Sequence, residues 1–255
     1  FVEKNASTKL VLVGSNNSLY AYHVADHTGT IAVSAGTTVT SGAMTAISGS
    51  DDASIIAVGL SDSVEIYNKS LALLQTISVT NQTVTVSADG SYLFVGDATA
   101  ANDDNTSGQV YVYKLVSGSF ELDQTLINPA DTAGMNFGIS IDVTESNNEL
   151  VISATGNNGT LDTTFDKKLT TFDGGITKIK GTELQSGAVY IYNRHYDRFV
   201  YAQELVDQFA VDNSGTNYGH MVLINDTEVM VSMPAISNTN ITSTNGVTLI
   251  SLIGR

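Results

Sequence analysis

A short motif recurs five times along the chain, and its spacing constrains the fold more than any other feature. The copies read NNSLYAYH from Asn16, SDSVEIYN from Ser61, SGQVYVYK from Ser107, SGAVYIYN from Ser186 and NGVTLISL from Asn245. Measured from Tyr22 to Tyr67, Tyr113 and Tyr192, the successive intervals are 45, 46 and 79 residues. The longest interval contains the longest insertion, so the repeat itself is close to 45 residues. In a chain of 255 residues this indicates about five copies of one structural unit.

Each copy of this motif is one of four predicted strands. A dense apolar run ending in a small residue precedes it, as in SYLFVGD from Ser91 and ELVISAT from Glu149, which is typical of a strand buried on both faces. An earlier strand is predicted from Ala43, Thr83, Phe137 and Tyr218, and a later one in GTIAVSA, LLQTISV, FELDQTL and RFVYAQEL. No segment has the three-and-four spacing of an amphipathic helix. The sequence therefore predicts an all-β chain.

Four-stranded antiparallel units of this length, repeated around an axis, are the blades of a β-propeller. We expect one propeller domain with blades at about 1–42, 43–82, 83–134, 135–214 and 215–255. The first unit lacks an inner strand and the last lacks an outer one. Residues 1–5 could supply that outer strand and close the ring, or further sequence completes a larger ring. Phe1 in place of Met favours a processed product or an excerpt of a longer chain.

The stretch NFGISIDVTESNNELVISATG, followed later by SGAVYIYNRHYDRFVYAQEL, resembles the FG-GAP repeat in its bacterial or phage-type variant. That family is distantly similar to the integrin α-subunit propeller. The resemblance is closest over 135–205, extends to 217–235 and 83–126, and leaves the first two units without a Phe-Gly pair. In integrin-like repeats calcium lies in a D-x-D-x-D-G loop between the first two strands. The corresponding turns here, SADGSY, VTESNNEL and INDTEV, have too few carboxylates for such a site.

Two aromatic-glycine pairs, Phe137-Gly138 and Tyr218-Gly219, open the inner strands of the last two units. We expect the aromatic ring to pack between neighbouring blades. The glycine permits a turn or a close backbone approach that a β-carbon would block. The tyrosines of the recurring motif alternate along their strand and therefore share one face, which predicts packing between blades.

An acidic stretch, GDATAANDDNTSG, follows one of the buried strands and is the candidate metal site. Its oxygen-bearing side chains are Asp97, Asp103, Asp104 and Asn105. Oxygen ligands at such spacing suit calcium, so calcium is the one cofactor this sequence suggests. We favour the other interpretation, a solvated acidic loop with no bound cofactor, and keep calcium as the alternative.

All the long insertions, at 97–106, 157–185 and 235–244, fall between the second and third strands of a unit. In a propeller these connections share one face, and loops on a rigid scaffold commonly carry recognition. We therefore expect this face to contact partners. The largest insertion also holds a local group of basic and aromatic residues, which are Lys167, Lys168, Phe172, Lys178 and Lys180.

The formal charge of −15, from 11 basic and 26 acidic residues, argues against nucleic acid or an anionic membrane surface as partner. No apolar run reaches the length of a membrane span, so membrane insertion is not expected. The absence of cysteine favours a bacterial or viral source over a eukaryotic extracellular one.

No G-x-S-x-G, P-loop, G-x-G-x-x-G or H-E-x-x-H motif occurs, and the four histidines lack metal-ligand spacing. We therefore expect a non-enzymatic structural or interaction module of a virion, such as a phage tail or fibre, or of a bacterial surface. Its partners are expected to be proteins of a larger assembly. Two alternatives are a propeller hydrolase or lyase acting on surface glycan, and a calcium-dependent adhesion module.

Overall fold

The computed structural model describes residues 8–15, 18–25, 31–33, 37–38, 43–80, 83–101, 107–129, 134–155, 168–170, 176–178, 187–206, 218–233 and 246–251. All regular elements in these ranges are strands, and they form five sheets of three or four strands and one two-stranded sheet. The predicted all-β class is confirmed. Within the same ranges there is no helix long and apolar enough to cross a membrane.

The three central sheets have the same construction, with four antiparallel strands in chain order. The second sheet contains β5 (Met44–Gly49), β6 (Ile56–Leu60), β7 (Ser63–Tyr67) and β8 (Leu73–Ser78). The third contains β9 (Thr83–Val86), β10 (Tyr92–Asp97), β11 (Gln109–Val116) and β12 (Ser119–Ile127). The fourth contains β13 (Phe137–Val143), β14 (Glu149–Ala154), β17 (Ala188–His195) and β18 (Arg198–Val206).

The first and last sheets differ from this plan in the part of the chain that the structure describes. In the first, β1 (Thr8–Ser15) pairs with β2 (Ser18–Ala25), which pairs with β3 (Ile31–Val33) and β4 (Thr37–Thr38). Because β1 corresponds to a second strand, this sheet has no inner strand among the described residues. The last sheet contains β19 (Val222–Ile224), β20 (Glu228–Met233) and β21 (Gly246–Ser251), and no outer strand in the part described.

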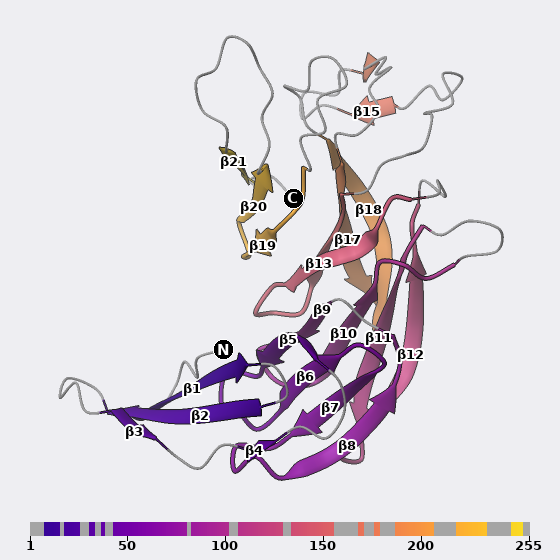
Figure 1. Cartoon of the computed structure of the whole chain (residues 1–255). Coiled ribbons are helices and arrows are strands. Elements are labelled where there is room, and N and C mark those ends of the chain that lie inside the picture. The colour runs from indigo at the N-terminus through magenta and orange to yellow at the C-terminus, as the bar shows by residue number, and fades with distance from the viewer. Residues whose placement is uncertain are drawn as a thin grey trace.

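The five sheets follow one another around an arc, with the first and the fifth at its two ends (Figure 1). Their inner strands β5, β9, β13 and β19 contact one another in that order. The strands β8, β12 and β18 lie on the outer side of the second, third and fourth sheets. We refer to the sheets as blades 1 to 5, and to the face of each blade that looks toward the next blade in the chain as its forward face. The opposite one is its backward face.

Apolar side chains fill each of the four junctions between consecutive blades. All residues of β6 and β10 are buried, because each of these strands has a packed blade on both sides. The junction of blades 3 and 4 is the most aromatic. There the Phe94 and Phe199 rings meet edge to face at 5.4 Å, and Phe137 meets Tyr190 at 5.7 Å. The predicted packing of the motif tyrosines between blades is confirmed for Tyr190 and Tyr192.

Close backbone contact joins blades 3 and 4 beside this aromatic core. Gly108 has a φ of +86°, and a β-carbon placed on it would lie 2.2 Å from the Phe137 carbonyl oxygen. The Phe137 N–H donates to the Ser107 carbonyl oxygen at 2.9 Å. The Ser-Gly before the third strand of one blade therefore receives the aromatic-glycine pair of the next.

Glutamine side chains join the outer strands of neighbouring blades. The Gln75 amide donates to the Phe120 carbonyl oxygen at 2.9 Å and accepts from the Phe120 N–H at 2.8 Å. Gln124 makes the same pair of bonds with Phe199, at 2.8 and 3.0 Å. Each glutamine lies beside a β-bulge at the same register, where a bulge can redirect a side chain across the junction.

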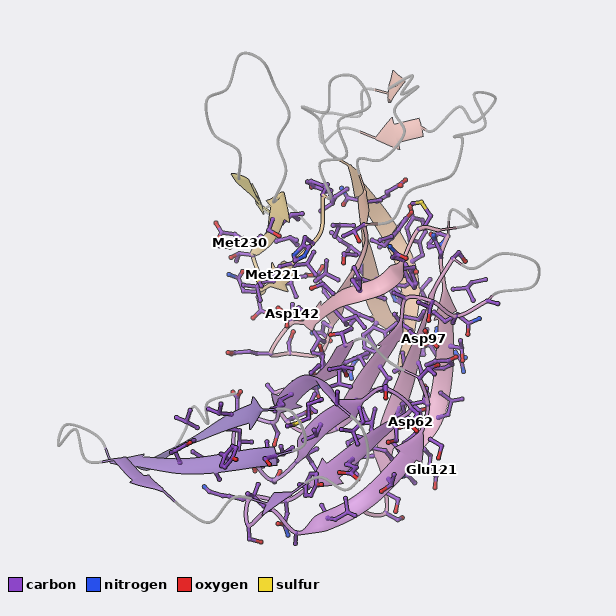
Figure 2. The ribbon with its side chains drawn as sticks, viewed as in Figure 1. Asp62, Asp97, Glu121, Asp142, Met221 and Met230 are labelled. Carbon is purple, nitrogen blue, oxygen red and sulfur yellow. The ribbon has the colours of Figure 1, made fainter. Side chains whose placement is uncertain are left out.

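Polar side chains join the inner strands in a similar way. Ser48 Oγ accepts from the Val86 N–H at 2.9 Å, and Thr85 Oγ1 donates to the Ile141 carbonyl oxygen at 2.8 Å. Asp142, which is labelled in Figure 2, accepts from the Ile224 N–H through Oδ2 at 2.8 Å. Each blade from 2 to 4 is thus bonded to the following inner strand by a residue at one repeated position.

Candidate interaction face

The three long connections leave from one side of the arc, which we call the loop rim. Gly108, the residue before β11, lies against Phe137, and Gly187, the residue before β17, lies against Tyr218. The ends of β10, β14 and β20 are next to these contacts, because Phe137 pairs with Ala154 and the Gly219 N–H donates to the Ser232 carbonyl oxygen. The long segments that connect second to third strands are 98–108, 155–187 and 234–245, whereas the corresponding segments of blades 1 and 2 are 16–17 and 61–62.

Asp97, the first predicted calcium ligand, ends β10 and is buried at this rim. Its Oδ1 accepts from the Thr99 N–H at 3.0 Å and from the Thr99 hydroxyl at 2.8 Å. Its Oδ2 accepts from the Thr80 hydroxyl, which precedes β9. The Asp97 carboxylate therefore fixes the turn after β10 and connects it to the link from blade 2.

The other three predicted ligands, Asp103, Asp104 and Asn105, lie outside the described residues. Within the ranges that are described, no group of three or more His, Cys, Asp or Glu residues is placed to hold a metal ion. The calcium site stays a prediction, and it would have to recruit an Asp97 carboxylate that already accepts hydrogen bonds from Thr80 and Thr99.

Two of the predicted contact residues, Lys168 and Lys178, belong to short strands inside the largest connection. β15 (Lys168–Thr170) pairs with β16 (Ile176–Lys178), and the register places Lys168 directly opposite Lys178. This two-stranded sheet was not predicted from the sequence. Lys167, Phe172 and Lys180 lie outside the described residues.

The opposite side of the arc carries short turns that are closed internally. In blade 3, Asp89 Oδ1 accepts from the Ser87 hydroxyl at 2.7 Å and from the Ser91 N–H at 3.0 Å. Burial alone would raise the pKa of Asp89, but these hydrogen bonds outweigh it and lower the pKa to about 2. In blade 2, Asp52 takes the same place between Ser50 and Ser54. The SADGSY turn, one of the three that correspond to integrin calcium loops, is thus held by serine donors, and the blade 2 turn has the same construction.

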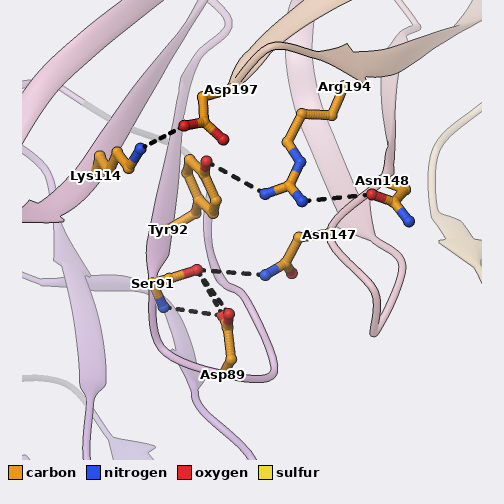
Figure 3. A network of polar contacts seen from close by, with 8 residues as sticks. All are labelled: Asp89, Ser91, Tyr92, Lys114, Asn147, Asn148, Arg194 and Asp197. Carbon is orange, nitrogen blue, oxygen red and sulfur yellow. Dashed lines mark hydrogen bonds and ion pairs between the residues drawn. The ribbon is translucent and has the colours of Figure 1, made fainter.

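Around Tyr92 these turns connect blades 3 and 4 (Figure 3). The Lys114 ammonium and the Arg194 guanidinium lie 6.0 and 5.8 Å from the Tyr92 ring centroid. Lys114 also pairs with Asp197 at 3.2 Å, and this hydrogen bond raises the pKa of Lys114. The contacts on the short-turn side of the arc hold blades 3 and 4 together. The enlarged connections lie on the opposite side, the loop rim.

Comparison with known proteins identifies structures of similar fold but no family to which the chain belongs. No protein-family model matches the chain, and no curated protein matches its sequence. Kuenenia stuttgartiensis hydrazine synthase superimposes with a TM-score of 0.62 and 14% identity, over 96% of this chain and 60% of that one. The β-propeller domain of Myceliophteria thermophila Cps50 (Swd1) superimposes with a TM-score of 0.55 and 7% identity, over 96% and 66%.

The fold is that of a β-propeller. The five antiparallel sheets and the Cps50 (Swd1) propeller domain confirm this part of the prediction. The chain spans less than two thirds of the length of either of these structures. At such low identities they are informative about the fold alone, and membership of the FG-GAP family stays a prediction.

Sequence reasoning missed the polar groups that join the blades. Gln75 and Gln124 each stand two residues after a leucine of the outer strand, Leu73 or Leu122, and this recurrence was a detectable signal. The inner-strand residues Ser48, Thr85 and Asp142 share a position but no chemistry beyond polarity, so no motif marks them.

Proposed function

We propose that this chain is a non-enzymatic structural or interaction module, an FG-GAP-like propeller that contacts protein partners through its loop rim. Its place would be in a larger assembly on a virion, such as a phage tail or fibre, or on a bacterial surface. The observation that carries the proposal is that blades 3, 4 and 5 all enlarge the same connection, between second and third strands. A single recognition surface is the simplest physical use of three extensions on one rim.

The junctions beneath the loop rim support this proposal, because they hold the bases of the connections in place. Gly108 and Phe137 are in direct backbone contact, and Asp97 closes the first turn of its connection through Thr99. Recognition loops on a fixed scaffold lose less entropy on binding than loops on a mobile one.

The largest connection includes a local group of basic and aromatic residues in an otherwise acidic chain, and we expect this group to contact the partner. Its members are Lys167, Lys168, Phe172, Lys178 and Lys180. The net charge of −15 over the chain argues against nucleic acid and anionic lipid as partners.

The proposal is tested by measuring the binding of labelled protein to intact bacterial cells and to phage particles. One variant replaces 157–185 by a short glycine-rich turn, and a control variant carries Tyr196→Ser, at a fully exposed position on the opposite side. We expect the first variant to lose binding at least tenfold and the control to retain it. Equal binding by both variants, or no binding by the parent protein, would contradict the proposal.

An activity assay on the same samples distinguishes the proposed non-enzymatic module from the alternative, a glycan hydrolase or lyase. If incubation with a panel of surface polysaccharides releases reducing ends or unsaturated products, the protein is a hydrolase or lyase and the non-enzymatic reading is wrong.

A further inference from the structure

Among the described side chains, large apolar groups are exposed on the forward face of blade 5. Met221, Leu223 and Met230 are 56%, 50% and 43% exposed, and Met221 and Met230 lie together on this blade (Figure 2). On the backward face of the same blade, Val229 and Val231 are fully buried against blade 4. An apolar sheet face of this kind is unusual on a protein that remains alone in water.

In blade 4 the equivalent forward face is covered. Leu223 pairs with Met230 across β19 and β20, as Asp142 pairs with Val151 across β13 and β14. Val151 is fully buried at the junction with blade 5, and Asp142 bonds the blade 5 inner strand. The pair in blade 4 that corresponds to Leu223 and Met230 is therefore covered by the following blade.

Apolar side chains are also exposed on the backward face of blade 1, in the part of that blade that the structure describes. Val13 and Tyr20 are directly paired and are 46% and 37% exposed. Ile152 and Tyr190 form the equivalent pair in blade 4 and are buried against blade 3. Leu12 and Ala21, on the other face of blade 1, are buried against blade 2. Blade 1 thus presents the kind of face that packs on a forward face.

These two faces are complementary in one specific respect. At the position where Ser48, Thr85 and Asp142 bond the following inner strand, blade 5 has Leu223, which has no polar atom to do so. Blade 1, among the described residues, has no inner strand to be bonded. The forward face of blade 5, which lacks the polar side chain, therefore fits blade 1, which lacks an inner strand among the described residues.

We propose that the forward face of blade 5 packs on the backward face of blade 1 of a second copy of this chain. The contact continues the established series of junctions, in which each forward face meets a backward face. Since the two surfaces differ, the association is head to tail. This inference is independent of the function proposed for the loop rim.

The test is the mass of the protein by light scattering and sedimentation over a range of concentrations. We expect the parent protein to form dimers and longer species as concentration rises. Leu223→Glu, which blocks blade 5, and Tyr20→Glu, which blocks blade 1, should each weaken association more than about tenfold, because each buries an unpaired carboxylate. Leu122→Glu, at an exposed apolar position on the outer strand β12, serves as the matched control and should associate like the parent.

Mixing the two blocked variants gives the decisive result. Each retains one intact face, so the mixture should form a dimer that grows no further, while each variant alone stays monomeric. Formation of this dimer also shows that both variants are folded. A parent protein that is monomeric at all concentrations, a dimer of either blocked variant alone, or no dimer in the mixture would overturn the proposal.

Discussion

Gly187 lies so close to Tyr218 that a β-carbon on the glycine would be 2.2 Å from the tyrosine carbonyl oxygen. The contact joins blade 4 to blade 5 and repeats the contact of Gly108 with Phe137 one blade earlier. The recurring Ser-Gly and the aromatic-glycine pair are thus the two sides of one junction. This relationship places the loop-bearing ends of neighbouring blades side by side.

Replacing Gln124 by Leu should lower the free energy of unfolding by about 2 kcal/mol. The substitution removes two hydrogen bonds and leaves the N–H of the buried Phe199 without its acceptor at the junction. Urea denaturation measures the effect. Gln109→Leu removes a single exposed bond to the Ala101 carbonyl oxygen and should cost less than about 0.5 kcal/mol. Equal losses would show that the glutamine bridge does not stabilise the junction.

Asp89 predicts an acid-dependent loss of stability. Its pKa falls from the ordinary 3.8 to about 2 in the folded protein, so its contribution is present above pH 4 and is lost as the pH falls toward 2. Because the residue is largely exposed, we expect about 1 kcal/mol after solvent screening. Asp89→Asn should lower Tm at pH 7, and its difference from the parent should disappear near pH 2. A difference that stays constant from pH 7 to pH 2 would contradict this role.

A calcium ion in the acidic connection predicts a rise in Tm when calcium is added and a fall with EDTA. At a concentration 100-fold above the dissociation constant, the stabilisation would be about 2.7 kcal/mol. Asp104→Asn should abolish the response without changing the metal-free Tm. Asp97→Asn should lower the metal-free Tm as well, because buried Asp97 holds Thr80 and Thr99. No response of the parent protein to calcium or EDTA would rule out the site.

Strand order and burial were predictable because they depend on local pattern. The dense apolar runs of β6, β10 and β14 required a packed surface on both faces, and the structure confirms that prediction. The Phe137-Gly138 pair predicted a close backbone contact from local sequence as well, because glycine has no β-carbon to block such a contact.

The residue pairs that contact each other across a junction between blades were harder to predict, because the two residues are distant in sequence. That Gly108 receives Phe137, or that Gln75 bonds the Phe120 backbone, depends on the register between blades, which no single strand encodes. The short pair β15 and β16 was missed because three residues per strand are too few for a period. The sequence predicted which strands the candidate loops connect. It did not predict the contacts at the bases of these loops.

The most direct measurement is the free energy of unfolding of Gly187→Ala compared with Gly118→Ala. Both glycines have positive φ, at +79° and +90°, but nothing lies within 4 Å of a β-carbon on Gly118. Gly118→Ala should therefore cost only the backbone strain, about 1 kcal/mol. Gly187→Ala must also push Tyr218 away and should cost at least about 3 kcal/mol. Equal losses would contradict a close backbone junction between blades 4 and 5, and with it the fixed loop rim.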